Sequence, residues 1–481
     1  MCKITKHYWL RERIMEYVMI EKHKVPIIAD VDFFVAGGGC AGVGAAISAG
    51  RAGLRVFLAE RLFCLGGMMT AGLMSKIAIA PQNLGLATEI IQRMDELQNS
   101  NYIASRPEVP IDPEIAKYIL DEMVIKECNV DVRFGTTVTD VISINSKVKT
   151  VIINSIEGQQ AVRATFFADC TGDGQLSFLA GAECLIDNER IASSPSLLFR
   201  VGNCDFDKLY EFMRDNEEIM RPEYVTYKRH LMTPAQWREN IDKELYAHIA
   251  DFVKYIRLKC TERRDLFSEE EEKILLRRGI LFMSQPTPGN VMVNSTTKPN
   301  FHGISSKEIS DAVVDGRYQA RLLHRFMKTF IPGFENSFIM DTAQMLGIRE
   351  SRRIRGDYIL TQNDIESLAR FDDAICSNHG GIEIHTGKDN DGLLIRELEE
   401  TDFYDVPYRC VIAKGFHNLF IAGRCFSASH EALSAARNIA YCCALGEACG
   451  TAAGILIKNK KTDVRDINYH TLRESLYKNI G

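Results

Sequence analysis

Residues 31–42, VDFFVAGGGCAG, decide the fold of this chain. The apolar run at 31–36 is typical of a strand buried on both faces, and three consecutive glycines follow it. The spacing Gly37-x-Gly39-x-x-Gly42 fits the fingerprint with which a β-α-β unit holds a dinucleotide. Gly37 permits the tight turn, Gly39 lets the backbone approach a pyrophosphate, and Gly42 lets the next helix pack close to the strand.

The residues after the glycines complete the unit. Residues 40–53, CAGVGAAISAGRAG, predict a helix whose first N–H groups, at Cys40 and Ala41, face the phosphates. Residues 54–60, LRVFLAE, predict a second buried strand, and Glu60 at its end is placed to accept hydrogen bonds from a ribose. A plain glycine-rich turn is the alternative, but the two strands, the helix and the acid together favour a dinucleotide site.

Composition excludes several classes of function. The 481 residues are 46% hydrophobic and carry a net charge of −6, so the chain has no positive field to gather nucleic acid or an anionic membrane. The 14 cysteines include no C-x-x-C pair, which indicates reduced thiols. Residues 438–457 are apolar around a central Glu447, so we interpret them as a buried helix. With no secretory pattern in residues 1–27, we expect a cytoplasmic protein.

Other segments show the periodicity of helices and strands. Residues 112–127 begin with Asp-Pro and predict a helix, and residues 305–330 predict a longer one. Strand-like pieces between 130 and 170, two of them separated only by 145–147, predict a β-meander. Residues 205–280 are charge-rich and helical in pattern.

Three further stretches extend the dinucleotide pattern. Arg61 is followed by the pair Gly66-Gly67, which continues along a long cofactor instead of starting the next crossover helix. Residues 166–174, FFADCTGDG, predict a strand that ends in a T-G-D-G turn, and residues 418–424, NLFIAGR, predict one that ends in Ala-Gly-Arg.

With these stretches the chain resembles the FAD-dependent oxidoreductases of the glutathione-reductase fold superfamily. More closely, it is similar to the bacterial FAD-dependent oxidoreductase family related to fumarate-reductase flavoproteins and thiazole-synthase-like proteins. The resemblance covers about residues 25–457; Ala36 stands where valine is more usual, and Cys40 where proline is common. The stretches that carry it are DVDFFVAGGGCAGVGAAISAG, ERLFCLGGMMTAG, ADCTGDGQLSFLAGAE, GIRESRRIRGDYILT, RFDDAIC, IEIH, YDVPYRC and NLFIAGRCFSASHEALSAARNIAYCCALGEACGTAA.

The resemblance implies noncovalent FAD and an α/β fold. It implies a Rossmann-like FAD-binding domain of the glutathione-reductase type, formed by residues 28–190 and 341–457, with an inserted α+β substrate domain over 191–340 and a C-terminal tail over 458–481. The return to an apolar, glycine-bearing composition after about residue 340 agrees with this division. The residues assigned to the cofactor are Gly37, Gly39, Cys40, Ala41, Gly42, Glu60, Arg61, Gly66, Gly67, Met68, Val138, Thr171, Gly172, Asp173, Gly423, Arg424, Ala435 and Ala436.

A second nucleotide site is an alternative interpretation of the T-G-D-G turn. The sequence from Gly172 almost repeats the fingerprint and could start a separate NAD(P)H domain. However, the helix that follows would be short, no second strand ending in an acid comes about 20 residues later, and Ser177 replaces the third glycine. We therefore expect this turn to approach the FAD with its backbone.

Two histidines and two arginines are the candidate catalytic residues. His385 lies in IEIHTGKDNDG and His430 in SASHEALSAARN, and the resemblance implies that both lie near the reactive edge of the flavin. Arg352 could clamp a carboxylate or a polyol, with structural salt bridging as an equal alternative. Arg437 could lie near the flavin pyrimidine, where positive charge stabilises the reduced anion. Of the two histidines we favour His430 as the base; no metal site is predicted.

Two stripes of small residues suggest a close helix pair. Gly446, Gly450 and Gly454 lie four residues apart on one helical face, as do Gly42, Ala46 and Gly50 on the first helix. We expect the two stripes to face each other and so to join the two ends of the chain. The alternative is that each stripe packs on the sheet alone.

The expected function is hydride transfer between flavin N5 and a small polar organic substrate, such as an organic acid, a polyol or a sugar. An unidentified electron acceptor or donor would complete the cycle. The alternatives are a structural flavin and a thiazole-synthase-like role. The sequence leaves the substrate, the direction of the reaction and the oligomeric state open.

Overall fold

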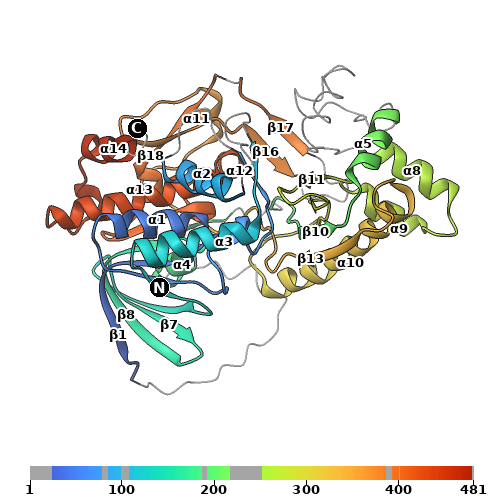
Figure 1. Cartoon of the computed structure of the whole chain (residues 1–481). Coiled ribbons are helices and arrows are strands. Elements are labelled where there is room, and N and C mark those ends of the chain that lie inside the picture. Colours follow the sequence, from blue (N-terminus) through green and yellow to red (C-terminus); the bar gives the residue numbers. More distant parts are fainter. Residues whose placement is uncertain are drawn as a thin grey trace, which may run out of the picture.

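The computed structural model describes residues 24–78, 85–98, 108–186, 192–216, 252–385, 393–399 and 401–478. They form two lobes that lie side by side (Figure 1). The larger contains the paired helices α1 (Cys40–Arg51) and α13 (Ile439–Lys458), and the smaller contains the long helix α10 (Ser306–Phe330).

A seven-stranded sheet forms the base of the larger lobe. Its strands are β1 (Ile27–Ala36), β2 (Val56–Ala59), β5 (Asp131–Arg133), β6 (Thr137–Ile144), β7 (Lys147–Ser155), β8 (Gly158–Asp169) and β19 (Leu419–Ile421). The order is β5-β2-β1-β8-β7-β6, and β19 also pairs with β8. Strands β5, β2, β1, β8 and β19 are parallel, as the apolar strands of a Rossmann-like unit require. The α/β fold class predicted from the sequence is therefore confirmed.

The register brings the carboxyl ends of four parallel strands together. Ala36 at the end of β1 is opposite both Ala59 of β2 and Asp169 of β8, and Asp169 is opposite Ile421 of β19. Strand β8 pairs with β1 on one side and has two partners on the other, because its first part pairs with β7 and its last residues pair with β19. One edge of the sheet thus carries the four turns that contain the sequence motifs.

The predicted β-meander is confirmed. Strands β6, β7 and β8 are consecutive and antiparallel. Asn145 and Ser146 connect β6 to β7 with φ angles of 49° and 60°. Two residues with positive φ match the right-handed twist of a hairpin, which explains why this short connection suffices.

The smaller lobe has its own antiparallel sheet, in the order β11-β12-β10-β13. Helix α10 confirms the long helix predicted over 305–330, and Ser305 caps its N-terminus by accepting from the Glu308 N–H. Of the helical pattern over 205–280, three helices are described, and residues 217–251 lie outside the described residues. The elements of this lobe besides α10 are β10 (Phe199–Gly202), α5 (Phe206–Asp215), α8 (Val253–Glu262), α9 (Glu269–Leu276), β11 (Phe282–Ser284), β12 (Val291–Val293) and β13 (Phe338–Thr342).

Shorter elements complete the fold. The predicted helix over 112–127 is present as α3 followed by a π-helix, and Asp112 caps it by accepting from the Glu114 N–H. The remaining elements are η1 (Gly67–Met69), β3 (Lys76–Ala78), α2 (Leu86–Gln98), β4 (Glu108–Pro110), α3 (Pro113–Asp121), η2 (Glu122–Glu127), α4 (Gln175–Ala180), β9 (Cys184–Leu185), β14 (Arg353–Ile354), α11 (Gln362–Glu366), β15 (Ala374–Asn378), β16 (Ile382–His385), β17 (Leu393–Arg396), β18 (Tyr404–Pro407), η4 (Tyr408–Val411), η5 (Gly423–Cys425), α12 (His430–Ala436), η6 (Val464–Asp466) and α14 (Tyr469–Lys478).

Helices α1 and α13 pack backbone against backbone, as predicted for the glycine stripe on α13. A Cβ placed on Gly446 would lie 1.8 Å from the carbonyl oxygen of Ala41, and one on Gly450 would lie 2.3 Å from that of Ala45. A Cβ on Gly454 would lie 2.6 Å from Ala52 Cβ. Only glycine leaves room for α1 at these positions, so the two helices join the two ends of the chain.

The stripe predicted on α1 was the wrong one. Gly42 faces the glycine turn, where a Cβ would lie 1.8 Å from the Gly37 carbonyl oxygen, and Gly50 faces Cys128. The face of α1 that meets α13 lies around Ala41, Ala45 and Ala49, one residue earlier in each turn. The predicted stripe does not form that face, because Gly42 is needed for the contact with the turn at Gly37 and Gly50 for the contact with Cys128, the residue after η2.

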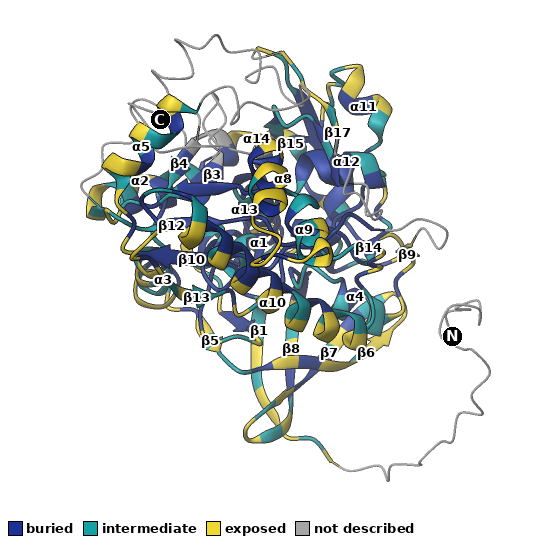
Figure 2. Cartoon of the chain, turned by 90° about the vertical axis from the view of Figure 1, so that its right-hand side faces the viewer, coloured by how far each residue is buried: buried dark blue, intermediate teal, exposed yellow. Residues whose placement is uncertain are grey.

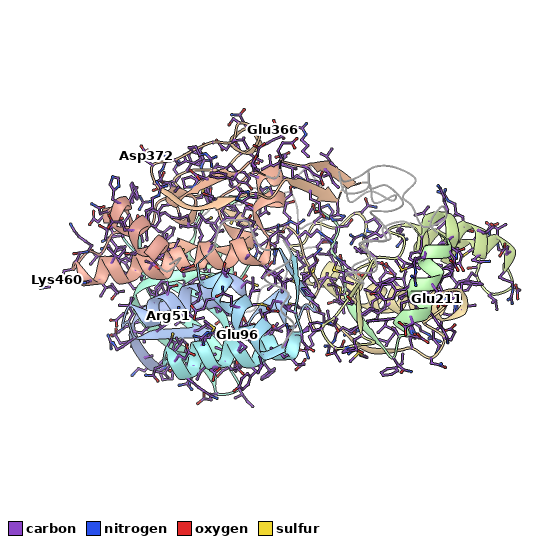
Figure 3. All side chains as sticks on the ribbon, turned by 45° about the horizontal axis from the view of Figure 1, so that its top comes forward. Arg51, Glu96, Glu211, Glu366, Asp372 and Lys460 are labelled. Carbon is purple, nitrogen blue, oxygen red and sulfur yellow. The ribbon has the colours of Figure 1, made fainter. Side chains whose placement is uncertain are left out.

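Helix α13 is the one described helix that is long and apolar enough to cross a membrane. It is packed inside the larger lobe, where 83% of its most apolar window is buried (Figure 2). Charged residues outside it, such as Glu366, Asp372 and Lys460, are exposed at the outer edge of the lobe (Figure 3). The burial of α13 agrees with its interpretation as a core helix.

Candidate active site

The glycine turn after β1 has the geometry that its sequence predicts. Gly37 has a φ of +92°, and a Cβ there would lie 2.7 Å from the Cys170 carbonyl oxygen. Gly42 packs against the same turn, as described above. Gly39 differs, because a Cβ on it would meet nothing within 4 Å. The backbone at Gly39 is therefore open to a ligand at the N-terminus of α1.

The pair Gly66-Gly67 lies directly against this turn. The Gly66 N–H donates to the Gly38 carbonyl at 2.8 Å, and a Cβ on Gly67 would lie 3.1 Å from Gly39 Cα. Both glycines have positive φ, and Met68 follows them in η1. Cys40 closes the junction, since its thiol donates to the Gly66 carbonyl at 3.1 Å. Burial raises the pKa of Cys40 to about 12, so this thiol is neutral.

Glu60 is a buried acid at the end of β2. Its Oε2 accepts from the Gly38 N–H at 2.5 Å, and its Oε1 accepts from the Leu62 N–H at 2.7 Å. A carboxylate offers about four acceptor positions, so these two bonds leave room for ribose hydroxyls. Glu60 thus has a second task that the sequence did not predict, which is to hold the glycine turn.

Replacing Glu60 with alanine should weaken binding of a dinucleotide about 10-fold or more. The change removes the ribose acceptor and leaves two backbone N–H groups without their carboxylate, at about 1–3 kcal/mol for each buried unsatisfied group. A fluorescence titration of the apoprotein with cofactor measures the affinity. Glu114→Ala, an exposed glutamate on α3, is the matched control and should bind normally. Unchanged affinity in Glu60→Ala would exclude this role.

The turn after β8 is organised by Asp169, which the sequence analysis did not select. Its Oδ1 accepts from the Thr171 hydroxyl at 2.7 Å, and its Oδ2 accepts from the Ser177 N–H at 2.7 Å. Burial raises the pKa of Asp169, and the bonds from Ser177 and Thr171 oppose that shift. The position of Asp169 at the end of an apolar strand was the feature of the sequence that could have indicated this role.

Asp173 and Arg424 join the turns after β8 and β19. Arg424 donates to Asp173 Oδ1 at 2.7 Å and to the Ser351 hydroxyl at 2.6 Å. Burial raises the pKa of Asp173, but Arg424 and Ser351 outweigh it and hold the pKa below its usual value. Arg61, after β2, lies 4.0 Å from Asp173. Gly172 packs on Arg424, with 3.1 Å from a Cβ to the guanidinium.

In the described residues, the T-G-D-G turn starts no second nucleotide-binding unit. The helix after it, α4, has six residues, and the next strand, β9, has two. Strand β9 pairs with β14 and not with the main sheet. The helix after this turn is thus short, as predicted, and the strand that follows it lies outside the parallel sheet.

The other residues assigned to the cofactor lie in three places. Gly423 has a φ of +79° directly after β19, where it packs on Ala41 of α1. Val138 is buried in β6, within the meander. Ala435 and Ala436 end helix α12, both buried.

The first candidate histidine, His430, begins α12 and pairs with a glutamate. Its Nδ1 lies 2.5 Å from Glu350 Oε2, and both side chains are buried. Arg353 lies 3.1 Å from the other carboxylate oxygen, Oε1. Burial raises the pKa of Glu350, but His430 and Arg353 outweigh it and hold the pKa below its usual value.

The second candidate histidine, His385, also pairs with a glutamate. Its Nε2 lies 3.2 Å from Glu383 Oε1, on strand β16. The Glu383 N–H donates to Ser434 of α12 at 3.2 Å, so β16 and α12 are in contact. Burial raises the pKa of Glu383, but His385, Arg437 and Arg349 hold it well below its usual value.

Arg437, directly after α12, connects the two pairs. Burial lowers the pKa of Arg437, and both Glu383 and Glu350 oppose that shift. Ser351, the neighbour of Glu350, accepts from Arg424 at 2.6 Å, which places the Glu350–His430 pair close to the turn after β19. The structure therefore brings His430, His385 and Arg437 together, although they come from separate stretches of the chain.

Arg352 does not join this cluster. Its guanidinium stacks on the Phe178 ring at 4.4 Å and donates to the Asp173 carbonyl at 3.4 Å. Its neighbour Arg349 reaches the smaller lobe instead, where it donates to the Ser194 carbonyl and, at 2.8 Å, to the Ser196 hydroxyl. The interpretation of Arg352 as structural is the one that these contacts favour.

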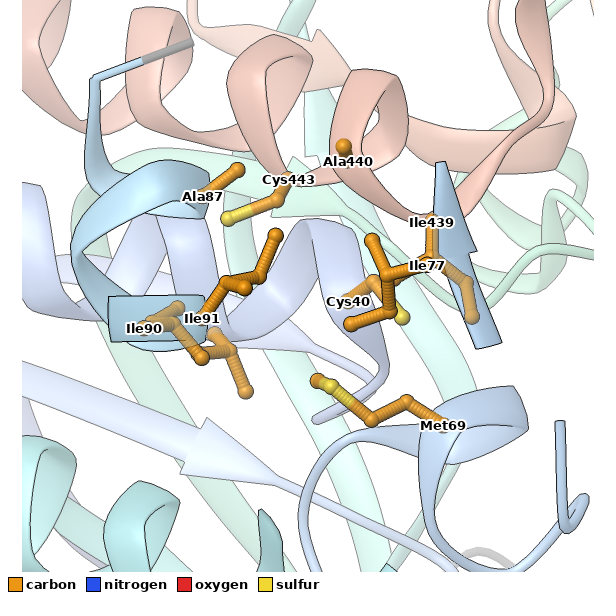
Figure 4. A pocket seen from close by; sticks show the side chains of 10 residues that line it. Cys40, Met69, Ile77, Ala87, Ile90, Ile91, Ile439, Ala440 and Cys443 are labelled. Atoms are coloured by element: carbon orange, nitrogen blue, oxygen red, sulfur yellow. The ribbon is translucent and has the colours of Figure 1, made fainter. Parts of the chain in front are cut away.

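An apolar pocket lies behind the glycine turn (Figure 4). It is bounded by α1, α2, α13, β3 and η1, and Cys40, Met69 and Cys443 contribute sulfur atoms to its wall. Its lining contains no charged side chain, so it differs in chemistry from the Glu–His cluster. The residues that line it are Cys40, Val43, Met69, Ile77, Ala87, Ile90, Ile91, Ile439, Ala440 and Cys443.

Comparison with known families identifies the cofactor. The family described as FAD dependent oxidoreductase matches residues 32–476, which is most of the chain and both lobes. The chain belongs to this family. This FAD-dependent oxidoreductase therefore uses FAD and is an enzyme, as the sequence motifs predicted. No curated protein matches its sequence.

Several solved structures are similar to this FAD-dependent oxidoreductase. A geranylgeranyl bacteriochlorophyll reductase-like protein from Thermoplasma acidophilum has 12% identity over 94% of this chain and 84% of that chain, with a TM-score of 0.45. The p-nitrophenol 4-monooxygenase from Pseudomonas putida has 13% identity over 94% and 87%, with a TM-score of 0.45. THI4 from Thermovibrio ammonificans has 21% identity over 39% and 72%, with a TM-score of 0.27.

The residues at the sheet edge fit FAD. Gly39 leaves open space at a helix N-terminus, which suits a pyrophosphate, and Glu60 has acceptor positions that suit a ribose. The pair Gly66-Gly67 and the Asp173–Arg424 link continue the same edge away from β2. An extended dinucleotide is therefore compatible with the order of the turns.

Proposed function

We propose that this oxidoreductase moves a hydride between a carbon atom of a small polar organic substrate and N5 of FAD. Organic acids, polyols and sugars are the substrate classes that we propose. The observation that supports this most is the cluster in which two Glu–His pairs meet at Arg437 beside the cofactor turns. When bound, FAD supplies the hydride acceptor or donor.

In this proposal His430 is the acid–base group. Its Nδ1 is occupied by Glu350, so proton transfer takes place at Nε2. In the oxidative direction Nε2 accepts the hydroxyl proton or the α-proton of the substrate, and in the reductive direction it returns a proton. Histidine suits this task because its unperturbed pKa of about 6.5 is close to neutral pH.

His385 and Arg437 orient the substrate and set the charge of the site. Glu383 holds the His385 ring through Nε2, and in this proposal His385 orients substrate hydroxyls or carboxylates. Arg437 provides a positive charge that acts on both glutamates, and such a charge stabilises negative charge that develops during the reaction. Both roles require the site to exclude bulk water, as the burial of His385 and His430 indicates.

The alternatives are less well supported. A purely structural flavin needs no buried acid–base pair such as Glu350–His430, and a thiazole-synthase-like role does not use the whole of the second lobe. We also propose an electron acceptor or donor that completes the cycle, and a cytoplasmic location. Kinship with fumarate-reductase flavoproteins within the family stays a proposal.

An anaerobic substrate screen tests the function. The purified protein with FAD is mixed with a panel of organic acids, polyols and sugars, and flavin absorbance near 450 nm is followed. We expect at least one class to bleach the flavin, and the photoreduced protein to be reoxidised by an unsaturated acid if the enzyme works as a reductase. NADH and NADPH, included in the panel, should be poor donors. A flavin that no compound reduces or reoxidises would favour the structural role.

A further inference from the structure

We propose that Glu350 is the positioning residue for His430, and that it keeps Nε2 of that histidine free to accept a proton. This inference rests on the proposed function, because it names the group that directs the acid–base histidine. Glu350 was not among the residues that the sequence motifs selected. Its role follows from its contacts with His430 and Arg353 and from the segment that carries it.

The first argument is the direction of the hydrogen bond. A pKa below the usual value keeps Glu350 ionised, and an ionised carboxylate can only accept. His430 must therefore donate from Nδ1 across the 2.5 Å contact. In a neutral imidazole this leaves the lone pair on Nε2. Among the described residues, Nε2 of His430 has no hydrogen-bond partner.

The second argument is that the Glu350 side chain is held in place from the far side. Arg353 forms an ion pair with Glu350 at 3.1 Å, and Arg353 is itself fixed by donating to the Ala428 carbonyl at 2.7 Å. Ala428 precedes His430 by two residues. The carboxylate and the histidine thus belong to one closed loop of contacts, so neither can turn alone.

The third argument is that Glu350 shares its segment with a cofactor turn. Ser351 donates to Asp173 at 2.8 Å and accepts from Arg424 at 2.6 Å. Ser351 therefore contacts the cofactor turns, and its neighbour Glu350 contacts His430. A shift of the flavin relative to the base would require this segment to move.

The Glu383–His385 pair differs from the Glu350–His430 pair in the ring nitrogen that the glutamate contacts. Glu383 contacts Nε2 of His385, whereas Glu350 contacts Nδ1 of His430. The two glutamates therefore select opposite ring nitrogens. This difference assigns proton transfer at Nε2 to His430, while the Nε2 of His385 is engaged by its own glutamate.

The test is the tautomer of His430, read by ¹⁵N NMR of the holoprotein labelled at histidine. The signals of His430 are assigned by their loss in His430→Gln. We expect the wild type to carry its proton on Nδ1 at a pH where the imidazole is neutral. In Glu350→Gln, whose amide can donate, we expect the Nδ1 proton signal to be lost. Glu383→Gln is the matched control and should change the signals of His385 alone.

Two results would overturn the inference. One is a wild-type His430 with its proton on Nε2, which needs no variant and so is decisive even if Glu350→Gln does not fold. The other is an unchanged His430 spectrum in folded Glu350→Gln. Neither measurement needs a substrate, so a failed substrate screen would refute the proposed function and leave this result standing.

A rate measurement separates positioning from a merely structural contribution. With a compound that the screen has shown to bleach the flavin, Glu350→Gln should lose about 10²-fold or more in reduction rate while it retains FAD. The double variant with His430→Gln should be no slower than His430→Gln alone, because the two residues act as one unit. Multiplied losses in the double variant would contradict the pairing.

Discussion

Replacing His430 with glutamine should leave FAD bound and lower the rate of flavin reduction by substrate about 10²–10⁴-fold, the usual loss for an acid–base group. The reason is that glutamine keeps the size of the side chain and a hydrogen bond to Glu350 but cannot take up the substrate proton. FAD should remain because the hydrogen bond of His430 goes to Glu350 and not to a glycine turn. Anaerobic stopped-flow measurements with a substrate from the screen give the rate, and absorbance gives the flavin content.

The control for this variant is His417→Gln. His417 precedes β19 and pairs with Asp463 at 2.5 Å, at the end of the strand opposite the cofactor turns. It is also a histidine bound through Nδ1 to an acid, so it tests the general cost of removing such a pair. We expect a normal rate in His417→Gln. Should His430→Gln reduce its flavin as fast as the wild type, the base is another group, and His385 is next to be tested.

Two tyrosines, Tyr404 and Tyr408, are the next candidates for the base after the histidines, and both are placed unfavourably. Tyr408 donates to the Val464 carbonyl at 2.9 Å and packs its ring on Phe420 in the core. Tyr404 is fully buried, and burial raises its pKa well above the usual value. Neither hydroxyl can lose a proton easily, which leaves the histidines as the candidates.

The parallel sheet could be predicted from the sequence because its signals are local. One β-α-β unit contains the run at 31–36, the glycines after it and Glu60. The residues that form the turn after each strand also follow that strand directly in the sequence. The pairing of β8 with β19 was reachable only through the resemblance, because more than 240 residues separate the two strands.

The Glu–His pairs of the candidate active site could not be predicted in the same way. Glu350 and His430 are 80 residues apart, and only the folded chain shows that one contacts the other. The stretch IRESRR holds three arginines, and its spacing alone does not tell which one faces the cluster. In the structure Arg353 pairs with Glu350 and Arg349 acts on Glu383 through its charge, whereas Arg352 turns toward Phe178.

The small-residue stripes show the same limit on a single helix. Glycine and alanine are so frequent on α1 that two of its faces could have met α13. The choice between them depends on the turn at Gly37 and on Cys128, both of which need a close approach by glycine. On α13 the three glycines mark one face, and there the prediction is confirmed.

The last expectation concerns that face: Gly450→Leu should abolish soluble protein with bound flavin. A Cβ on Gly450 would already lie 2.3 Å from the Ala45 carbonyl oxygen and 2.9 Å from the Ala49 amide nitrogen. Both are backbone atoms of a buried helix and cannot move aside alone. A leucine adds three more carbons, and overpacking by single methylenes costs about 1–3 kcal/mol. Against a total stability of about 5–15 kcal/mol, the variant should not fold.

Two further variants test the reason for this expectation. Thr451→Leu adds a leucine one position further along α13, at a half-buried residue outside the glycine stripe, and should give a normal yield. Gly450→Ala adds the Cβ alone, and should give folded protein with a lowered melting temperature. Because α1 begins at the glycine turn through Cys40 and Ala41, its displacement should also weaken FAD binding in Gly450→Ala. A normal flavin content in Gly450→Leu would show that α1 and α13 do not need their close contact to hold the cofactor.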